Sequence, residues 1–226
     1  MHIILIILLL VTLIFAPQWW AKYTFRRYAS KQDHISGTGG ELARHLLDRF
    51  DMSDVGVEIT EHGDHYDPES KTVRLSSANY NDNSLTAVAV ATHEVGHAIQ
   101  DHNNESKLIL RTRLVKVAQL SAKLGSIIMI VMPLVMIITR SPVAGLVLTI
   151  AGLTSIAGSA LIHLVTLPVE WDASFGKALP ILKEGYVEEQ DLAAIESILK
   201  AAALTYVAAS LASILNIWRW IMLLRR

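Results

Sequence analysis

Four long apolar blocks constrain this chain more than any other feature of its sequence. A helix needs about 20 predominantly apolar residues to cross a bilayer, and each block approaches that length. The mean hydropathy is +0.38 and charged residues make up 18%, below the roughly 25% of soluble proteins. We therefore expect a mostly α-helical membrane protein. The blocks span Ile3–Trp20, Leu124–Thr139, Val143–Leu167 and Ala201–Leu224.

The blocks differ in how they would meet a bilayer. No Lys or Arg precedes the first block and no small-x-small site follows it, which favours a retained anchor over a cleaved signal peptide. A three-residue turn, Arg140–Pro142, separates the second block from the third and predicts a tight hairpin. Arg219 interrupts the fourth block, which could cross the bilayer or lie in its interface. The expected total is three or four transmembrane helices.

This pattern divides the chain into five segments. A hairpin of two spans returns the chain to the side that it left, so the two polar segments should face one compartment. Basic residues are frequent next to the first polar segment, and the positive-inside rule places that compartment in the cytoplasm. The segments are an N-terminal anchor (1–21), a polar segment (22–113), the hairpin (114–167), a second polar segment (168–200) and a C-terminal transmembrane or interfacial helix (201–226).

Charge and cysteine content exclude several classes of function. The formal net charge is −1, so no basic excess points to nucleic acid as a partner. The chain has no cysteine, which excludes disulfides, a thiolate nucleophile and cysteine-ligated zinc.

The first polar segment has the pattern of a small α+β unit. Thr38 and Glu41 have the spacing of a capping box, which begins an amphipathic helix. Ser84 can cap a later helix. The order helix, strand, strand, helix follows from a strand at Val55–Thr60, a turn at Glu61–Ser70, a strand at Thr72–Ser76 and a helix from Ser84 to about Asp101.

The last of these helices contains His93-Glu94-Val95-Gly96-His97, the H-E-x-x-H pattern. Residues four apart share one face of a helix, so both imidazoles can reach one ion. Glu94 can reach a water on that ion without coordinating it, which suits a general base. Gly96 costs nearly 1 kcal/mol of helix propensity against alanine, which suggests close packing there.

A catalytic zinc site usually has three protein ligands, so two histidines are not enough. Glu170 is the favoured third candidate, because it lies just beyond the hairpin, on the same side as the motif, where a helix should restart after Pro168. Asp172 is a rival two residues further on, and His163, at the end of a span, is another.

Five stretches of the chain form a recognisable set: Thr38–Glu41, Asp64–Pro68, Val73–Ser76, His93–Gln100 and Leu164–Ser174. Together they resemble the bacterial membrane zinc metallopeptidases typified by YugP, over most of the chain. The resemblance implies Zn²⁺ as the metal, Glu170 as its third ligand beside His93 and His97, and a minimal zincin-like unit fused to membrane helices.

The layout is also similar to the HtpX and CAAX prenyl proteases, where a Glu-x-x-x-Asp element follows a hairpin. This chain has Ser174 in the last place of that element. Asp101, four residues after His97, could orient that imidazole instead.

Resemblance to zincins also implies a substrate edge at Thr72–Ser77, where an extended peptide would add as a strand. The alternative is a plain structural strand. His65, Tyr66 and Tyr80 are candidate oxyanion stabilisers, between which the sequence does not choose.

We therefore expect a membrane-bound zinc endopeptidase whose partners are a polypeptide substrate and the lipid bilayer. Two alternatives stay open: a membrane adaptor that retains the metal site, and a zinc hydrolase of a non-peptide amide. The intact Glu94 argues against an adaptor, since an adaptor needs no base beside the metal. The sequence does not predict an oligomeric state.

Overall fold

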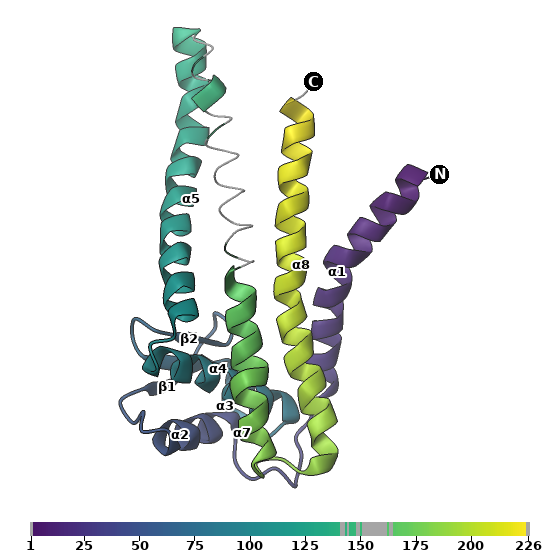
Figure 1. The fold of residues 1–226 in the computed structure, drawn as a ribbon, viewed down its shortest axis with the longest axis vertical. Coiled ribbons are helices and arrows are strands. Elements are labelled where there is room, and N and C mark those ends of the chain that lie inside the picture. Colours follow the sequence, from purple (N-terminus) through teal and green to yellow (C-terminus); the bar gives the residue numbers. More distant parts are fainter. Residues whose placement is uncertain are drawn as a thin grey trace.

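The computed structural model describes residues 2–140, 143, 145–147, 150, 162 and 165–224. Three long helices rise from one side of a smaller body that holds the sheet and the shorter helices (Figure 1). The elements in chain order are α1 (His2–Arg27), α2 (Gly39–Arg49), β1 (Gly56–Ile59), β2 (His65–Asp67), β3 (Thr72–Leu75), α3 (Ser77–Asn81), α4 (Leu85–His102), α5 (Ser106–Thr139), the π-helix η1 (Asp172–Ala178), α7 (Leu179–Lys183), the 3-10 helix η2 (Glu189–Asp191) and α8 (Leu192–Leu224).

The three strands form one small sheet with the order β1-β3-β2. Strand β1 pairs with β3 in parallel, and β2 pairs with β3 antiparallel, with Tyr66 opposite Val73. Because β3 lies in the centre, the predicted substrate edge at Thr72–Ser77 is wrong. The outer strands are β1 and β2, and β2 lies within the segment that was expected to be only a turn.

Side-chain caps fix where the two important helices of the body begin. At α2 the Thr38 hydroxyl accepts from the Glu41 backbone N–H, and the Glu41 carboxylate accepts from the Thr38 N–H. At α4 the Ser84 hydroxyl accepts from the Ala87 N–H. Both predicted caps are confirmed.

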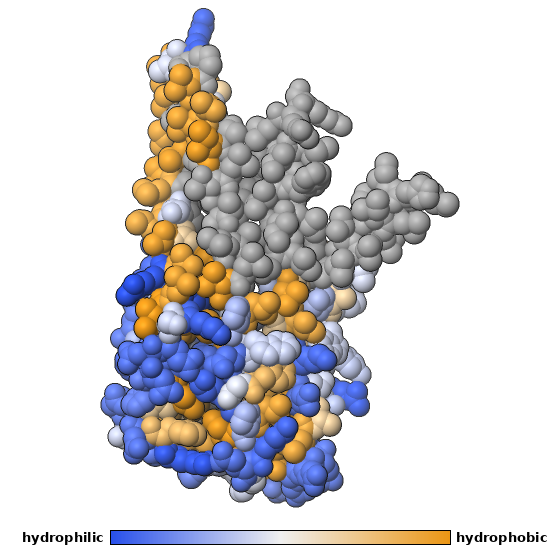
Figure 2. Space-filling view, in the orientation of Figure 1, coloured by the Kyte–Doolittle hydropathy of each residue, from blue (hydrophilic) through white to orange (hydrophobic). Residues whose placement is uncertain are grey.

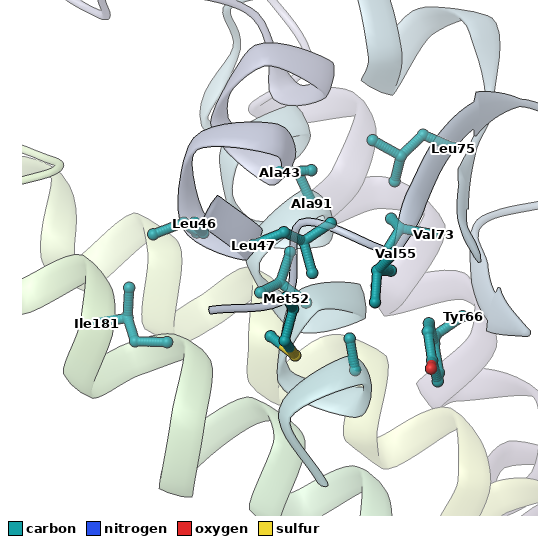
Figure 3. Close-up of a cluster of buried hydrophobic side chains, with 12 residues drawn as sticks. Ala43, Leu46, Leu47, Met52, Val55, Tyr66, Val73, Leu75, Ala91 and Ile181 are labelled. Atoms are coloured by element: carbon teal, nitrogen blue, oxygen red, sulfur yellow. The ribbon is translucent and has the colours of Figure 1, made fainter. Parts of the chain in front are cut away.

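A hydrophobic core joins α2, the sheet and α4 (Figure 3). Leu46 and Leu47 of α2 are fully buried in the same cluster as Val73 and Leu75 of the central strand. Ala91 and Val95 of α4 complete the contact, and their small size lets the motif helix lie close to the sheet. This packing holds α4 in a fixed place.

A second core ties α4 to the C-terminal helices. Ile195, Ile198 and Leu199 of α8 pack with Leu182 of α7 and with Val88 of α4. Helix α1 lies along α8 (Figure 1). The motif helix is therefore packed against the sheet and α2 in one core and against α7 and α8 in the other.

The described residues contain no helix that combines the length and apolarity required to cross a membrane, which contradicts the three or four predicted transmembrane helices. In α5, basic residues occupy the N-terminal part, so its apolar part is confined to 124–139, short of about 20 residues. Most of the predicted span Val143–Leu167 lies outside the described residues. The predicted cytoplasmic placement depended on these spans and stays a prediction.

Helix α5 nevertheless has an extensive apolar surface along the part that rises from the body (Figure 2). Ile130 is 73% exposed, Ile137 74% and Ile138 80%. A contiguous apolar surface of this kind usually marks an interaction site.

Candidate metal centre

The two motif histidines, His93 and His97, project from the same face of helix α4 toward one carboxylate. His97 is buried and His93 nearly so, and their rings meet edge to face with centroids 4.8 Å apart. The four-residue spacing along one helix produces this arrangement directly. The Nε2 atoms of both rings face the same carboxylate.

That carboxylate belongs to Glu170, which is 1% exposed. Its Oε2 lies 3.2 Å from His93 Nε2 and 3.2 Å from His97 Nε2. Three potential ligand atoms, one from each residue, lie within 4.8 Å of one another. The structure thus brings together the three residues that the sequence nominated as ligands.

The other two candidates for the third ligand do not join this group. Asp172 Oδ2 instead accepts hydrogen bonds from Gln100 and Lys177. His163 lies outside the described residues. Helical backbone is continuous from Val165 through Glu170, so the helix does not restart after Pro168 as expected.

Gly96 allows the segment that carries Glu170 to approach α4. A Cβ atom at Gly96 would lie 2.9 Å from the Ala173 carbonyl oxygen, closer than real Cβ contacts. The expected close packing is therefore confirmed. Ala173 lies in the π-helix η1. Such π-helical turns are rare in proteins overall, but those that occur are often found at functional sites.

Each imidazole is also held at its other nitrogen. His97 Nδ1 donates to Gln100 Oε1 at 2.9 Å, which leaves Nε2 with its lone pair toward Glu170. His93 Nδ1 lies 3.1 Å from the Ser174 hydroxyl. Ser174, in the place of the expected aspartate, therefore holds the first histidine.

Gln100 rather than Asp101 orients His97, so the expectation for Asp101 is wrong. The Gln100 amide also donates to the Val169 carbonyl and to Asp172, which fixes which end of the amide faces the ring. Asp101 points elsewhere and accepts from the Tyr66 hydroxyl and from Lys71. The position of Gln100, one turn after His97, was the available sequence signal.

Glu94 lies beside the histidines in a low-dielectric environment, 6% exposed. Burial raises its pKa to about 7, and the carboxylates of Glu170 and Asp64 act in the same direction. His93 and the Tyr66 backbone N–H oppose the rise. A carboxyl group that titrates near neutral pH is matched to proton transfer.

Two residues far away in the sequence approach Glu170. Arg111 Nη2 of α5 lies 3.7 Å from its Oε1. Burial raises the pKa of the Tyr206 phenol on α8, and the nearby Glu170 and Glu94 carboxylates raise it further. For Glu170 itself, burial works to raise the pKa, but both histidines outweigh it and hold the pKa well below its usual range.

Of the three predicted oxyanion candidates, two are engaged away from Glu94. The Tyr66 hydroxyl bonds to Asp101, and His65 Nδ1 lies 2.8 Å from the Gly63 carbonyl. The Tyr80 ring packs near Gly40. Tyr206, which sequence analysis missed, lines a pocket together with His93 and Glu94.

Two imidazole nitrogens and one carboxylate form the ligand set of a zinc site with an open fourth position. The three groups are buried together and their free nitrogens and oxygen converge. The residues present therefore fit a zinc ion, and Glu94 stands beside them as a separate acid–base group.

Comparisons with known proteins agree with this chemistry. A family model described as "Putative neutral zinc metallopeptidase" matches residues 3–225. The chain belongs to this zinc metallopeptidase family, which confirms the predicted resemblance and zinc as the cofactor.

A particular relative is the protein described as "Putative membrane protease YugP" from Bacillus subtilis (strain 168). It is 33% identical over 211 residues, which cover 92% of this chain and 90% of the relative. No solved structure was found to match the chain.

Proposed function

We propose that this protein is a zinc-dependent endopeptidase that hydrolyses peptide bonds of polypeptides at a membrane surface. The observation that carries the proposal is the buried group of His93, His97 and Glu170 with Glu94 beside it. Membership of the zinc metallopeptidase family supports the same activity.

In this proposal His93 and His97 hold the zinc through Nε2, and Glu170 holds it through its carboxylate. When bound, zinc would polarise the scissile carbonyl and lower the pKa of an attacking water toward about 7. Gln100 keeps the proton of His97 on Nδ1, and Ser174 fixes the ring of His93. Both contacts hold the ligand nitrogens in place before the metal binds.

Glu94 would take the proton of the attacking water and later deliver it to the leaving amine. Its pKa near 7 allows the carboxyl group to do both at neutral pH. Because Glu94 is buried, the proton stays in the site between the two transfers. These two steps consume one water and break one amide bond.

The position of β2 supports a polypeptide over a small amide as the substrate. The Tyr66 backbone N–H contributes to the environment of Glu94, so this outer strand lies beside the site. An extended peptide can pair with an outer strand of this kind. The intact base and ligand set also favour an enzyme over an adaptor.

Two observations support the membrane surface as the place of action. The relative from Bacillus subtilis is named a membrane protease. The exposed isoleucines of α5 offer an apolar face for a lipid bilayer (Figure 2).

Replacement of the proposed base tests the activity. Glu94→Gln should retain stoichiometric zinc but lose at least about 100-fold in kcat on peptides, because general base catalysis contributes about that much or more. Zinc content is measured by atomic emission and turnover by mass spectrometry of the products. Wild-type turnover in this variant would exclude Glu94 as the base.

A further inference from the structure

A pocket opens next to the metal centre between α1, α4 and α8. Its cavity measures about 190 Å³. The walls include Phe25 of α1, Val90 of α4, and Ile198, Leu199, Ala202 and Tyr206 of α8. His93 and Glu94 line the same pocket, so a group bound there would touch the reacting region.

The lining is mostly apolar, and most of its polar groups are already bonded. Thr205 donates its hydroxyl proton to the Ala202 carbonyl. Asp64 accepts from the Ser76 backbone N–H and from the Asn79 amide through its two oxygens. None of the described residues that line the pocket is a lysine or arginine, so no basic side chain there would pair with an acidic side chain of the substrate.

The volume of the pocket matches one large side chain. An apolar cavity of about 150 Å³ accommodates benzene in a protein interior. The space here is slightly larger, and Ile198 and Leu199 at its wall are each 1% exposed and firmly packed. Ala202 and Val90 are only half-buried, so their side chains set how much room remains.

We propose that this pocket receives the apolar side chain of the substrate residue next to the cleaved bond, of leucine, methionine or phenylalanine size. The proposal rests on the proposed peptidase function and adds the class of substrate. The pocket is continuous with the proposed reaction site, because His93 and Glu94 form part of its wall. A side chain bound in the pocket would therefore belong to a residue at the cleaved bond. Burial of a large apolar side chain increases binding by about 10- to 100-fold over a polar one.

The test uses zinc-loaded full-length protein and peptides that are identical except for one residue, which is Ala, Leu, Phe, Lys or Asp. The Leu and Phe peptides should be cut beside that residue with kcat/KM about 10- to 100-fold above the Asp peptide. Ala202→Phe, which fills the pocket, should remove this advantage, so that the Leu and Phe peptides are cut no faster than the Asp peptide. Ala193→Phe, on the exposed face of the same helix, is the matched control and should behave as wild type.

A second variant and a second readout keep the test decisive. Val90→Ala should enlarge the pocket and favour Phe over Leu, even if Ala202→Phe does not fold. Binding of the same peptides, fluorescently labelled, to the Glu94→Gln form by anisotropy measures the pocket without turnover.

Three outcomes would overturn the inference. They are equal kcat/KM on the Leu and Asp peptides, a preference for the Lys peptide caused by attraction to Asp64, or an Ala202→Phe variant with the same peptide preference as wild type. If no peptide is cut but the Leu peptide still binds preferentially, the proposed peptidase function would be wrong. The inference that the pocket binds an apolar side chain would still hold.

Discussion

Uncharged partners hold both metal-facing imidazoles of this protein. Gln100 accepts from His97, and the Ser174 hydroxyl contacts His93. Carboxylates often take these places in zinc sites and raise the basicity of the ligand. Here the negative charge is concentrated on Glu170, whose neighbour Arg111 balances part of it.

Removal of Glu170 should therefore abolish most of the zinc binding. In Glu170→Ala we expect zinc content after dialysis to fall from about one equivalent to a small fraction, because two neutral imidazoles remain. Plasma emission measures the metal. Glu196→Ala, an exposed glutamate of α8, is the control. Asp172 is unsuitable as a control because it contacts Gln100. Full zinc content in Glu170→Ala would remove this residue from the ligand set.

The raised pKa of Glu94 has a thermodynamic consequence in metal-free protein. Between its ordinary pKa of 4.5 and the folded value of about 7, the folded state holds a proton that the unfolded state has released. The free energy of unfolding should therefore fall as pH rises from about 5 to about 7, by at most about 3 kcal/mol from this group.

Urea unfolding of chelator-treated protein across this pH range measures the effect. The difference between wild type and Glu94→Gln isolates it, since glutamine does not titrate. Glu196→Gln, at an exposed position, should reproduce the wild-type slope. Parallel slopes for wild type and Glu94→Gln would show that Glu94 titrates normally.

Among the elements, the contact between α4 and η1 assembles the site. The helical turns that carry Glu170 and Ser174 lie against the face of α4 that carries both histidines. Gly96 sits between those histidines, where Ala173 comes too close for any side chain. One small residue therefore sets the distance between two elements.

Gly96→Ala tests this contact. Alanine gains nearly 1 kcal/mol of helix propensity, but the displaced η1 backbone should cost about 1–3 kcal/mol. We expect a net loss of up to about 2 kcal/mol in the free energy of unfolding, together with weaker zinc binding. Urea denaturation and competition with a chelator measure the two. A more stable variant with unchanged zinc affinity would contradict the proposed packing.

Sequence patterns predicted the elements that are specified locally. The caps at Thr38 and Ser84 and the spacing of His93 and His97 depend on neighbours within one helical turn. The strand β2 was missed because it has only three residues inside a polar turn, and pairing with β3 alone defines it. That pairing also moves β3 to the centre, which no local pattern reveals.

The rest of the site depends on contacts between distant segments. Arg111 and Tyr206 reach Glu170 from α5 and α8, and nothing in their local sequence distinguishes them from other helical residues. Ser174 was noticed only as a departure from a resembling element, and its contact with His93 required the fold. Glu170 was nominated as the third ligand from the sequence, but its neighbours Arg111 and Tyr206 could be found only from the fold.

At the scale of the whole molecule, polar and apolar surfaces are separated. The body around the sheet is largely hydrophilic, whereas the described face of α5 is apolar (Figure 2). The metal centre lies in the body, near the point where the long helices rise from it (Figure 1). This arrangement places the proposed active site close to any surface that α5 would contact.

The apolar face of α5 should bind lipid. In flotation with phosphatidylcholine vesicles we expect wild type to float and the double variant Ile137→Asp, Ile138→Asp to float several-fold less, since each charge opposes burial in apolar surroundings. Ile59→Asp, at an isoleucine of β1 that is 49% exposed, is the control for added charge. Equal flotation of all three proteins would exclude this face as the lipid contact.

The three proposed ligands lie up to 77 residues apart in the chain, on two separate helices. An unfolded chain cannot offer all three at once, so zinc would join α4 to the helical turn that carries Glu170. Zinc binding would then raise the free energy of unfolding, by about 2.7 kcal/mol when the free zinc concentration is a hundred times Kd. Loss of zinc would then lower the stability of the fold as well as remove the proposed activity.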